Sequence, residues 1–546
     1  AYMGLKNTDK TIESYQKALQ LNPNHTDAYN NMGMVFYDQG KFDEAVESYQ
    51  KAIKLEPDFA DAHYNLGNAL KQTGNLKQAI GSYRASLAIN PNDAEILLHY
   101  GNTLKNYGDF DHAIEIYAQA LKIDPNSAAA QTNMDNADEE KAEIDKNVAG
   151  YARIAKLEIG SAEIVSFTGT LLKARGFLDA AIDNYEQAIK IKPDYAEAYS
   201  NMGNVLNDKG ELDAAIDSYK QAIKIKPDYA EAYSNMGNAL KGMKFSRPIS
   251  ELPEIIVNLL NKNTYARPKD IAPAAISLIK LDKVFQSVLN RFFSGELEQT
   301  LEQSVSELSR IPLLVKMMEL CPLPDLEIEW LLTYLRSEIL SNLSQLSGTK
   351  ETLAFQSALA LQCFTNEYIY NQTDDDKKNL DDLENTVHKN IADGTQPAPL
   401  VLACLASYKA LYDYSWCHLV ALPDELKQLE KSQISDVKKE IVLRSEIPML
   451  NEITDDVSSK VRQQYEENPY PRWVNLKLPL EAKPISDIAK NINLKLSDKK
   501  IYDCNIPQIL VAGCGTGQHS IGTAARFKNC NVLAIDLSLR SLAYAK

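Results

Sequence analysis

The sequence has 546 residues, in which 58 Lys and Arg stand against 74 Asp and Glu, so its formal net charge is −16 at neutral pH. An acidic surface of this kind repels phosphate backbones, and we expect no nucleic-acid partner. The 7 cysteines form no C-x-x-C pair, and no apolar run approaches the roughly 18 residues that span a bilayer. We therefore expect a cytoplasmic chain without a membrane span. The length predicts several domains, and the first residue, Ala1, suggests a fragment.

A proline recurs through the first half of the chain at a spacing of 34 residues, once doubled to 68. These prolines are Pro23, Pro57, Pro91, Pro125, Pro193 and Pro227. In most units a glycine stands 24 residues before the proline, a second glycine 17 before it and a tyrosine eight before it. The first glycine lets two helices cross closely beside the ring, and the second supplies the turn between them. A fixed period of this length predicts a stack of helix pairs.

This spacing and these residues resemble the tetratricopeptide (TPR) repeat, and the resemblance covers residues 1–243. It implies paired antiparallel helices stacked into a right-handed superhelix with a concave groove. One unit, 128–161, departs from the pattern, because Asp135 replaces the first glycine and Asn147 replaces a small residue. We expect a degenerate repeat here, in which either the stack bends or a helix extends into solvent.

Asparagines recur at two places, three residues apart, on one face of the first helix of the repeats. They are Asn31, Asn65, Asn68, Asn102, Asn201, Asn204, Asn235 and Asn238. A carboxamide offers one acceptor and two donors, which suits pairing with the backbone of an extended peptide. The TPR groove of O-linked N-acetylglucosamine transferases has a similar asparagine ladder, and this part of the chain resembles it. We expect these residues to bind a protein or peptide; alternatively, they are polar surface residues that a helix tolerates.

After residue 243, four prolines between 248 and 273 predict a linker over 244–275. Residues 276–450 are apolar at helical spacing but have no repeat, so they predict a packed helical domain. No group of side chains in this domain has the spacing of a metal site, and we expect no bound metal.

The last part of the chain predicts a different structure. An apolar run, Ile509–Ala512, precedes the loop Gly513-Cys514-Gly515-Thr516-Gly517, which is followed by a helical stretch and by a second apolar run that leads to Asp536. This order predicts strand, glycine loop, helix and strand, with the loop at the carboxyl edge of a parallel sheet, where such folds bind ligands. Glycines let ligand atoms approach the backbone, and Asp536 stands where a carboxylate accepts hydrogen bonds from ribose hydroxyls.

The glycine spacing of this loop discriminates between nucleotides. A dinucleotide site requires glycine where Gln518 stands, and a phosphate-binding loop requires Lys-Ser/Thr after its glycine. The spacing G-x-G-x-G instead resembles the first motif of class I S-adenosylmethionine-dependent methyltransferases. The resemblance implies that the loop 513–517 lines the methionine end of S-adenosylmethionine and that Asp536 holds its ribose. Val511 departs from the family, which usually has an acidic residue there; a dinucleotide site and a glycine turn without a ligand are the alternatives.

Residues 451–500 are expected to form a charged lead-in helix and the segment NPYPRW. The strings VRQQYEENPYPRW and FQSALALQCFTNEYIY resemble bacterial proteins that fuse a TPR array to a class I methyltransferase, which extends the resemblance to nearly the whole chain. Residues 501–546 would then begin the methyltransferase domain, with its acceptor pocket beyond Lys546. Tyr465, Tyr470 and Trp473 either cap the sulfonium by cation–π attraction or pack the segment against the sheet.

The expected fold is therefore mainly α: a TPR α-solenoid, an irregular helical domain and the first β-α-β piece of a Rossmann-like methyltransferase. We expect the full-length protein to transfer a methyl group from S-adenosylmethionine, guided by the protein or peptide that the repeats bind. This chain alone is expected to be inactive, and its sequence identifies no catalytic residue. The alternative function is a non-catalytic TPR scaffold for protein–protein interactions, and an accessory role for a glycosyltransferase is a weaker third interpretation.

Overall fold

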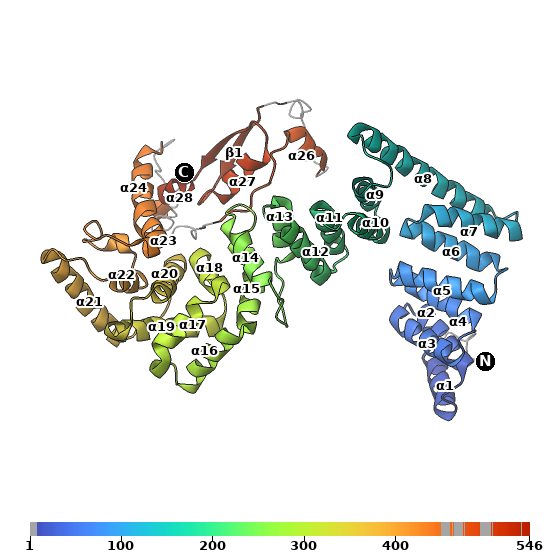
Figure 1. Cartoon of the computed structure of the whole chain (residues 1–546), viewed down its shortest axis with the longest axis horizontal. Helices are drawn as coiled ribbons and strands as arrows, with labels where there is room; N and C mark the ends of the chain where they lie inside the picture. Colours follow the sequence, from blue (N-terminus) through green and yellow to red (C-terminus); the bar gives the residue numbers. More distant parts are fainter. Residues whose placement is uncertain are drawn as a thin grey trace. The chain divides into compact units, whose positions relative to one another are not determined.

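The computed structural model describes residues 8–448, 459–460, 462–463, 473, 475–491, 504, 506–536 and 538–546. The chain forms two compact units, Ala1–Pro227 and Asp228–Lys546. Helices make up most of both units (Figure 1). Within the described residues, no helix is both long and apolar enough to cross a membrane.

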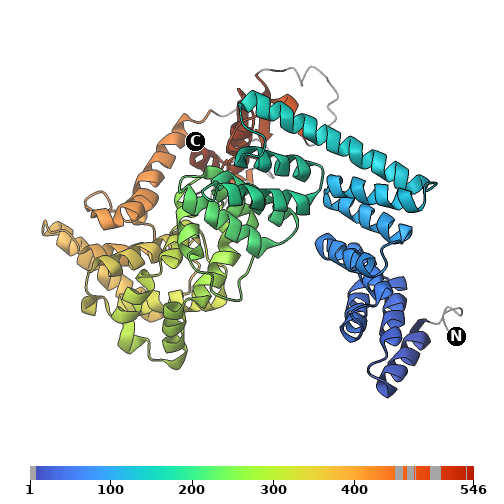
Figure 2. The same ribbon diagram turned by 45° about the vertical axis from the view of Figure 1, so that its right-hand side comes forward.

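The first unit is a succession of antiparallel helix pairs, which are seen from two directions in Figures 1 and 2. Its helices are α1 (Thr8–Leu21), α2 (Thr26–Asp38), α3 (Phe42–Leu55), α4 (Ala60–Gln72), α5 (Leu76–Ile89), α6 (Ala94–Tyr107), α7 (Phe110–Ile123), α8 (Ala128–Ala155), α9 (Ala162–Ala174), α10 (Leu178–Ile191), α11 (Ala196–Asp208) and α12 (Leu212–Ile225). Except at α8, the two helices of a pair have nearly equal length. The 34-residue period therefore corresponds to a TPR solenoid, as the sequence predicts.

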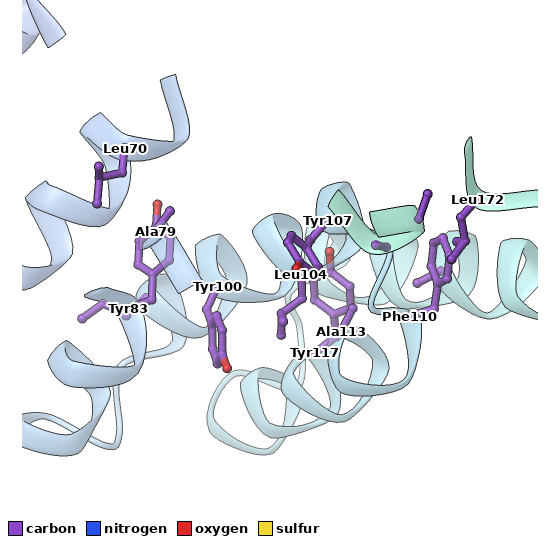
Figure 3. Packing of buried hydrophobic residues seen from close by; sticks show 14 of the residues in the cluster. Leu70, Ala79, Tyr83, Tyr100, Leu104, Tyr107, Phe110, Ala113, Tyr117 and Leu172 are labelled. Atoms are coloured by element: carbon purple, nitrogen blue, oxygen red, sulfur yellow. The ribbon is translucent and has the colours of Figure 1, made fainter. Parts of the chain in front are cut away.

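The contact that closes each pair joins the first glycine of the unit to the tyrosine 16 residues later. At Gly67, an added Cβ atom would lie only 2.8 Å from Cε1 of Tyr83, whose side chain is fully buried. The turn glycine serves a different purpose, since Gly74 has a φ of +79°, a conformation that other residues rarely adopt. Figure 3 shows the rings of Tyr83 and Tyr117 packed among the helices of this core. Both glycines are thus required by the geometry of the helix pair.

The unit 128–161 forms one helix of 28 residues, α8, instead of a pair. In the other units the turn glycine interrupts the helices, but the corresponding residue here is Ala142, which continues the helix. The helix ends at Ala155, where Lys156 takes the left-handed conformation with a φ of +54°. Ile154, near this end, is 80% exposed. Of the two alternatives for the degenerate repeat, the structure has the extended helix.

Because α8 supplies no second helix to the stack, the next pair packs against the preceding repeats directly. The Asp183 carboxylate, on α10, accepts hydrogen bonds from the Tyr107 hydroxyl and from Nζ of Lys77, the latter at 3.0 Å. Beside them, the rings of Phe110 and Phe177 meet edge to face at a centroid distance of 5.1 Å. These contacts keep the hydrophobic core continuous past the degenerate repeat.

The second unit begins with the last TPR helix, α13 (Ala230–Ala239), and continues with helices that have no regular period. These are α14 (Leu252–Asn261), α15 (Pro268–Leu281), α16 (Lys283–Ser294), η1 (Glu298–Thr300), α17 (Leu301–Ser309), α18 (Pro312–Leu320), α19 (Leu326–Ser341), η2 (Leu343–Gln345), α20 (Lys350–Thr365), α21 (Asp374–Ala392), α22 (Pro399–Ala406), η3 (Leu411–Asp413), η4 (Asp424–Leu426), α23 (Lys427–Glu430), η5 (Lys431–Ser435), α24 (Asp436–Glu446) and α26 (Ile485–Asn491). The predicted helical domain thus corresponds to packed helices.

The segment 244–275, predicted as a linker, contains α14 and part of α15 instead. Pro253 and Pro268 lie in the first turns of these helices, where proline's missing N–H costs no hydrogen bond. Leu252, Ile256 and Ile271 are fully buried. The segment is therefore part of the core of the second unit, and the linker prediction is corrected.

A small parallel sheet follows near the end of the chain. Strands β1 (Gln508–Ala512) and β2 (Asn531–Ile535) pair in parallel, with Leu510 opposite Leu533. The connection between them carries α27 (Gln518–Arg526), and α28 (Leu539–Ala545) follows β2. The order of strand, glycine loop, helix and strand is the one that the sequence predicts. The structure therefore shows a TPR solenoid, a further helical region and a two-stranded parallel sheet.

Candidate functional site

The asparagines at the second of the two repeat positions are held by the tyrosines that close the helix pairs. The hydroxyls of Tyr83, Tyr117 and Tyr219 donate hydrogen bonds of 2.7, 2.8 and 2.8 Å to Oδ1 of Asn68, Asn102 and Asn204, respectively. Each bond engages the carboxamide oxygen, so the amide NH₂ is the group left to act as a donor. The buried ring therefore orients the half-buried carboxamide.

The protonation of these tyrosines keeps the orientation constant. Burial raises the pKa of Tyr83 and of Tyr117 well above the ordinary value of 10.0, because a buried phenolate would lose its hydration. Both hydroxyls consequently remain donors throughout the neutral range. Titration of the tyrosines therefore does not disturb the hydrogen bonds to the asparagines in this range.

Two further contacts link carboxamides of successive repeats. Nδ2 of Asn65 donates to Oδ1 of Asn30 at 3.1 Å, and Nδ2 of Asn133 donates to Oδ1 of Asn102 at 2.8 Å. Asn30 and Asn133 are not among the asparagines that the sequence predicts for this surface. Asn133 could have been found, since it stands 68 residues after Asn65, two repeat periods away. Asn30 is buried and off the expected face, so no periodic signal indicated it.

The remaining predicted asparagines lie apart from these contacts. Asn31 and Asn201 are half-buried on α2 and α11 of the first unit, whereas Asn235 and Asn238 lie on α13 of the second unit. The Oδ1 atom of Asn238 accepts a hydrogen bond from Lys477 of the same unit. A side chain of this protein therefore occupies the acceptor that was predicted to face a peptide. The described surface of six asparagines in the first unit, which we call the asparagine surface, consists of Asn31, Asn65, Asn68, Asn102, Asn201 and Asn204.

The contact at Asn238 belongs to an extended segment that runs beside the end of α14. The backbone N–H groups of Leu476 and Leu478 donate to the carbonyls of Asn263 and Thr264 at 3.0 and 2.9 Å. Asn475 adds a side-chain bond of 2.8 Å to the carbonyl of Leu260. Residues 475–478 therefore pair with the backbone of residues 260–264 much as an added β-strand would.

The second predicted site is the glycine corner, which we define as residues 513–517 together with Asp536. Gly513, Gly515 and Gly517 have φ values of +67°, +51° and +87°, so all three occupy the left-handed region that favours glycine. The N–H groups of Gly513 and Cys514 donate to the carbonyl of Ile535 at 2.8 and 3.2 Å. The loop is thereby fixed at the carboxyl edge of the sheet.

The carboxylate of Asp536 lies on the loop, as the sequence predicts. Its Oδ2 accepts from the N–H of Gly515 at 2.7 Å, and its Oδ1 accepts from the N–H of Ser538 at 3.0 Å. A carboxylate oxygen has two acceptor positions, so each one retains capacity for a further donor. Burial, reinforced by the Asp536 charge, raises the pKa of the Cys514 thiol, which favours its protonated form.

The glycines of the corner differ in what surrounds them. A Cβ atom at Gly513 would have nothing within 4 Å, whereas one at Gly517 would clash with Cβ of Ala545. Packing against α28 thus accounts for Gly517 without a ligand. Gly513 and Asp536 are the residues whose surroundings leave room and hydrogen-bonding capacity for a nucleoside.

Trp473 packs against the glycine corner from the lead-in segment. Its indole Nε1 donates to the carbonyl of Thr516 at 2.8 Å, and its ring meets that of Tyr544 edge to face at 5.4 Å. Of the two roles predicted for Trp473, the structure therefore shows packing of the lead-in segment. The other two aromatic residues predicted to form a cap, Tyr465 and Tyr470, lie outside the described residues. Of the predicted lead-in helix, the structure describes residues 459–460 and 462–463, which are helical.

Family comparisons identify the repeats. A family model described as TPR repeat matches residues 1–40, 33–74, 169–206 and 203–244, and models described as tetratricopeptide repeat match residues 60–93 and 94–134. These ranges leave out 135–168, which holds most of α8. Residues 1–134 and 169–244 therefore consist of TPR repeats. No curated protein matches this chain.

Solved structures of other TPR proteins are similar at low identity. The TPR protein YrrB, described as having an unusual peptide-binding site, is 20% identical over 40% of this chain and 96% of its own, with a TM-score of 0.20. The TPR2AB domain of yeast Sti1, solved as a pHSP90 complex, is 20% identical over 54% of this chain and 98% of its own, with a TM-score of 0.21. MamA is 22% identical over 38% of this chain and 94% of its own, with a TM-score of 0.18.

Proposed function

We propose that this chain is a protein-interaction platform whose first unit binds an extended segment of a partner protein on the asparagine surface. The observation that carries the proposal is the set of hydrogen bonds from Tyr83, Tyr117 and Tyr219 to three asparagines in register along the solenoid. These bonds leave NH₂ donors repeated at the period of the array. An extended peptide offers backbone carbonyl acceptors along its length, whatever its sequence.

The test compares peptide capture by the intact chain and by the triple variant Asn68→Ala, Asn102→Ala and Asn204→Ala. Peptides from a displayed random library that bind the intact chain are measured against both proteins by fluorescence polarisation. Because the proposed contacts are to the peptide backbone, we expect the triple variant to lose about tenfold or more in affinity for peptides of unrelated sequence. Equal affinities for the two proteins would contradict the proposal.

We propose a second function for the glycine corner, namely binding of S-adenosylmethionine in a class I methyltransferase. The observation that favours it is Asp536, whose carboxylate lies against the N–H of Gly515 at the edge of two parallel strands. The backbone of Gly513, Cys514, Gly515, Thr516 and Gly517 would hold the methionine end, and Asp536 would hold the ribose. The cofactor would supply an electrophilic methyl group. This chain's own residues would orient it, and Trp473 would keep the loop in place.

Trp473 offers a direct readout of cofactor binding, since its indole is bonded to the loop. We expect S-adenosylhomocysteine, added to the intact chain, to change the tryptophan fluorescence along a saturable curve. Asp536→Ala should abolish that change, because it removes the ribose acceptor. As a control, Asp487→Ala alters an exposed carboxylate on α26, away from the corner. A curve that is identical in Asp536→Ala and in the intact chain would refute the assignment.

A further inference from the structure

Gly81 lies in the middle of α5 at a place where packing does not require glycine. Its backbone is not in the left-handed region, and an added Cβ atom would have nothing within 4 Å. A glycine inside a helix is destabilising relative to most other residues. At the same place in the repeat, other helices carry an acidic residue: Glu13, Glu47, Glu115, Asp183 and Asp217. Glycine at position 81 therefore destabilises α5, and no close packing contact requires it.

Gly81 lines a hollow of about 500 Å³ between α3, α4 and α5, which we call the Gly81 hollow. Its apolar lining includes Ile53, Leu66 and Ala85, and its polar lining includes Gln50, Lys54 and His63. The apolar side chains give the hollow a hydrophobic floor that water wets poorly, so an apolar group would gain free energy by entering it.

One charged side chain, Lys54, lines the hollow in a protein of net charge −16. Helix α5 contains no Asp or Glu, and the other ionisable group of the lining is the ring of His63, which is hydrogen-bonded to the carbonyl of Pro57. Arg84, one turn beyond Gly81 on α5, is exposed. A carboxylate at position 81, as in the other repeats, would offset these cations. Its absence leaves a surface that is complementary to acidic groups.

We propose that the Gly81 hollow receives one bulky apolar side chain from a partner protein segment whose neighbouring residues are acidic. The apolar side chain fills the space that Gly81 leaves, and the flanking carboxylates face Lys54 and Arg84. Leu66 and Asn65 are adjacent on α4 and so point to different sides of that helix. The Gly81 hollow is consequently a second surface, separate from the asparagine surface.

The experiment selects displayed random peptides on the intact chain and measures each one against Gly81→Glu and Gly81→Leu. Both variants place a side chain in the hollow. Gly81→Glu also restores the residue type of the other repeats, so this variant should melt at the same temperature as the intact chain or higher. Asn65→Ala, on the other side of α4, is the matched control. Circular dichroism of all variants verifies that the solenoid is folded.

We expect a class of peptides that binds the intact chain and Asn65→Ala but loses about tenfold or more in affinity for both Gly81 variants. These peptides should carry Leu, Ile, Phe or Trp beside Asp or Glu. The proposal is overturned if no selected peptide distinguishes the intact chain from the folded Gly81 variants. It is equally overturned if the peptides that do so are basic or lack a large apolar residue.

Discussion

The hydroxyl of Tyr117 donates a 2.8 Å hydrogen bond to Oδ1 of Asn102, and the same oxygen accepts Nδ2 of Asn133 from the next helix. The ring of Tyr117 is buried against Gly101, so one side chain both closes the helix pair and sets the direction of a surface carboxamide. Packing of the helix pair and orientation of the carboxamide are therefore coupled in the repeats that contain both the tyrosine and the asparagine. A substitution that removes only the hydroxyl and leaves the ring in place tests the hydrogen bond to the asparagine apart from the packing of the ring.

Tyr83→Phe separates them, because it retains the ring and removes the bond to Asn68. We expect a loss of about 1 kcal/mol in the free energy of unfolding, the usual net value of one such bond, measured by urea denaturation. Tyr117→Phe should cost less, since Asn102 keeps its bond to Asn133. In Tyr49→Phe, Met34 stands where the asparagine would be, so a neutral or stabilising effect is expected. A loss at Tyr49 equal to that at Tyr83 would count against the role of the asparagine.

Two glycines of neighbouring helices should respond to alanine in opposite directions. Gly67→Ala places a Cβ atom 2.8 Å from the Tyr83 ring, and we expect it to lower the free energy of unfolding by about 1–3 kcal/mol through overpacking. Gly81→Ala meets no atom within 4 Å and should raise it by about 0.5–1 kcal/mol through helix propensity. Thermal and urea unfolding of the two variants check both signs. A loss in Gly81→Ala would show that the position is sterically constrained.

Asp183→Ala tests the contact that bridges the degenerate repeat. The substitution leaves the half-buried Tyr107 hydroxyl and Lys77 without their acceptor, and we expect a loss of about 1–2 kcal/mol. Asp217→Ala is the matched control, because it occupies the same repeat position and pairs only with Lys220 on its own helix. Its expected effect is below about 0.5 kcal/mol. Similar losses in the two variants would mean that α10 gains little from Asp183.

His112 provides a pH dependence of known sign. Its hydrogen bond to Asp109, reinforced by the charge of that carboxylate, raises the pKa of the imidazole above 6.5. A raised pKa contributes stability that is fully present below about 6.5 and is lost as the pH rises through the folded-state value. NMR titration of His112 should show this raised value, and Asp109→Asn should return it toward 6.5. An unchanged titration in Asp109→Asn would contradict the assignment.

The solenoid was predictable because its signals are periodic and local. Pro57 ends a helix, Gly74 makes a turn and Tyr83 packs against Gly67. The equivalent residues have the same structural roles in the next repeat. The unit at 128–161 was less predictable, because the absence of a turn glycine at Ala142 is compatible with either a bend or a continuous helix. The structure has the continuous helix.

The sequence predicted the segment 244–275 wrongly, and it did not predict contacts between residues far apart in the chain. Pro253 and Pro268 were interpreted as marks of a linker, although proline is equally suited to the first turn of a helix. The bond from Trp473 to Thr516 and that from Lys477 to Asn238 join residues far apart in the sequence, and no local pattern indicates them. The glycine corner was predictable as strand, loop, helix and strand, whereas its occupant is not determined by that order.

The most direct test of the account replaces the proposed donors without disturbing their partners. In Asn68→Asp with Asn102→Asp, the carboxylates still accept from Tyr83 and Tyr117, but the NH₂ groups are gone. We predict that affinity for the selected peptides, measured by fluorescence polarisation, falls about tenfold or more while the urea midpoint stays the same. Unchanged affinity in this folded double variant would show that the asparagine surface does not donate hydrogen bonds to the peptide.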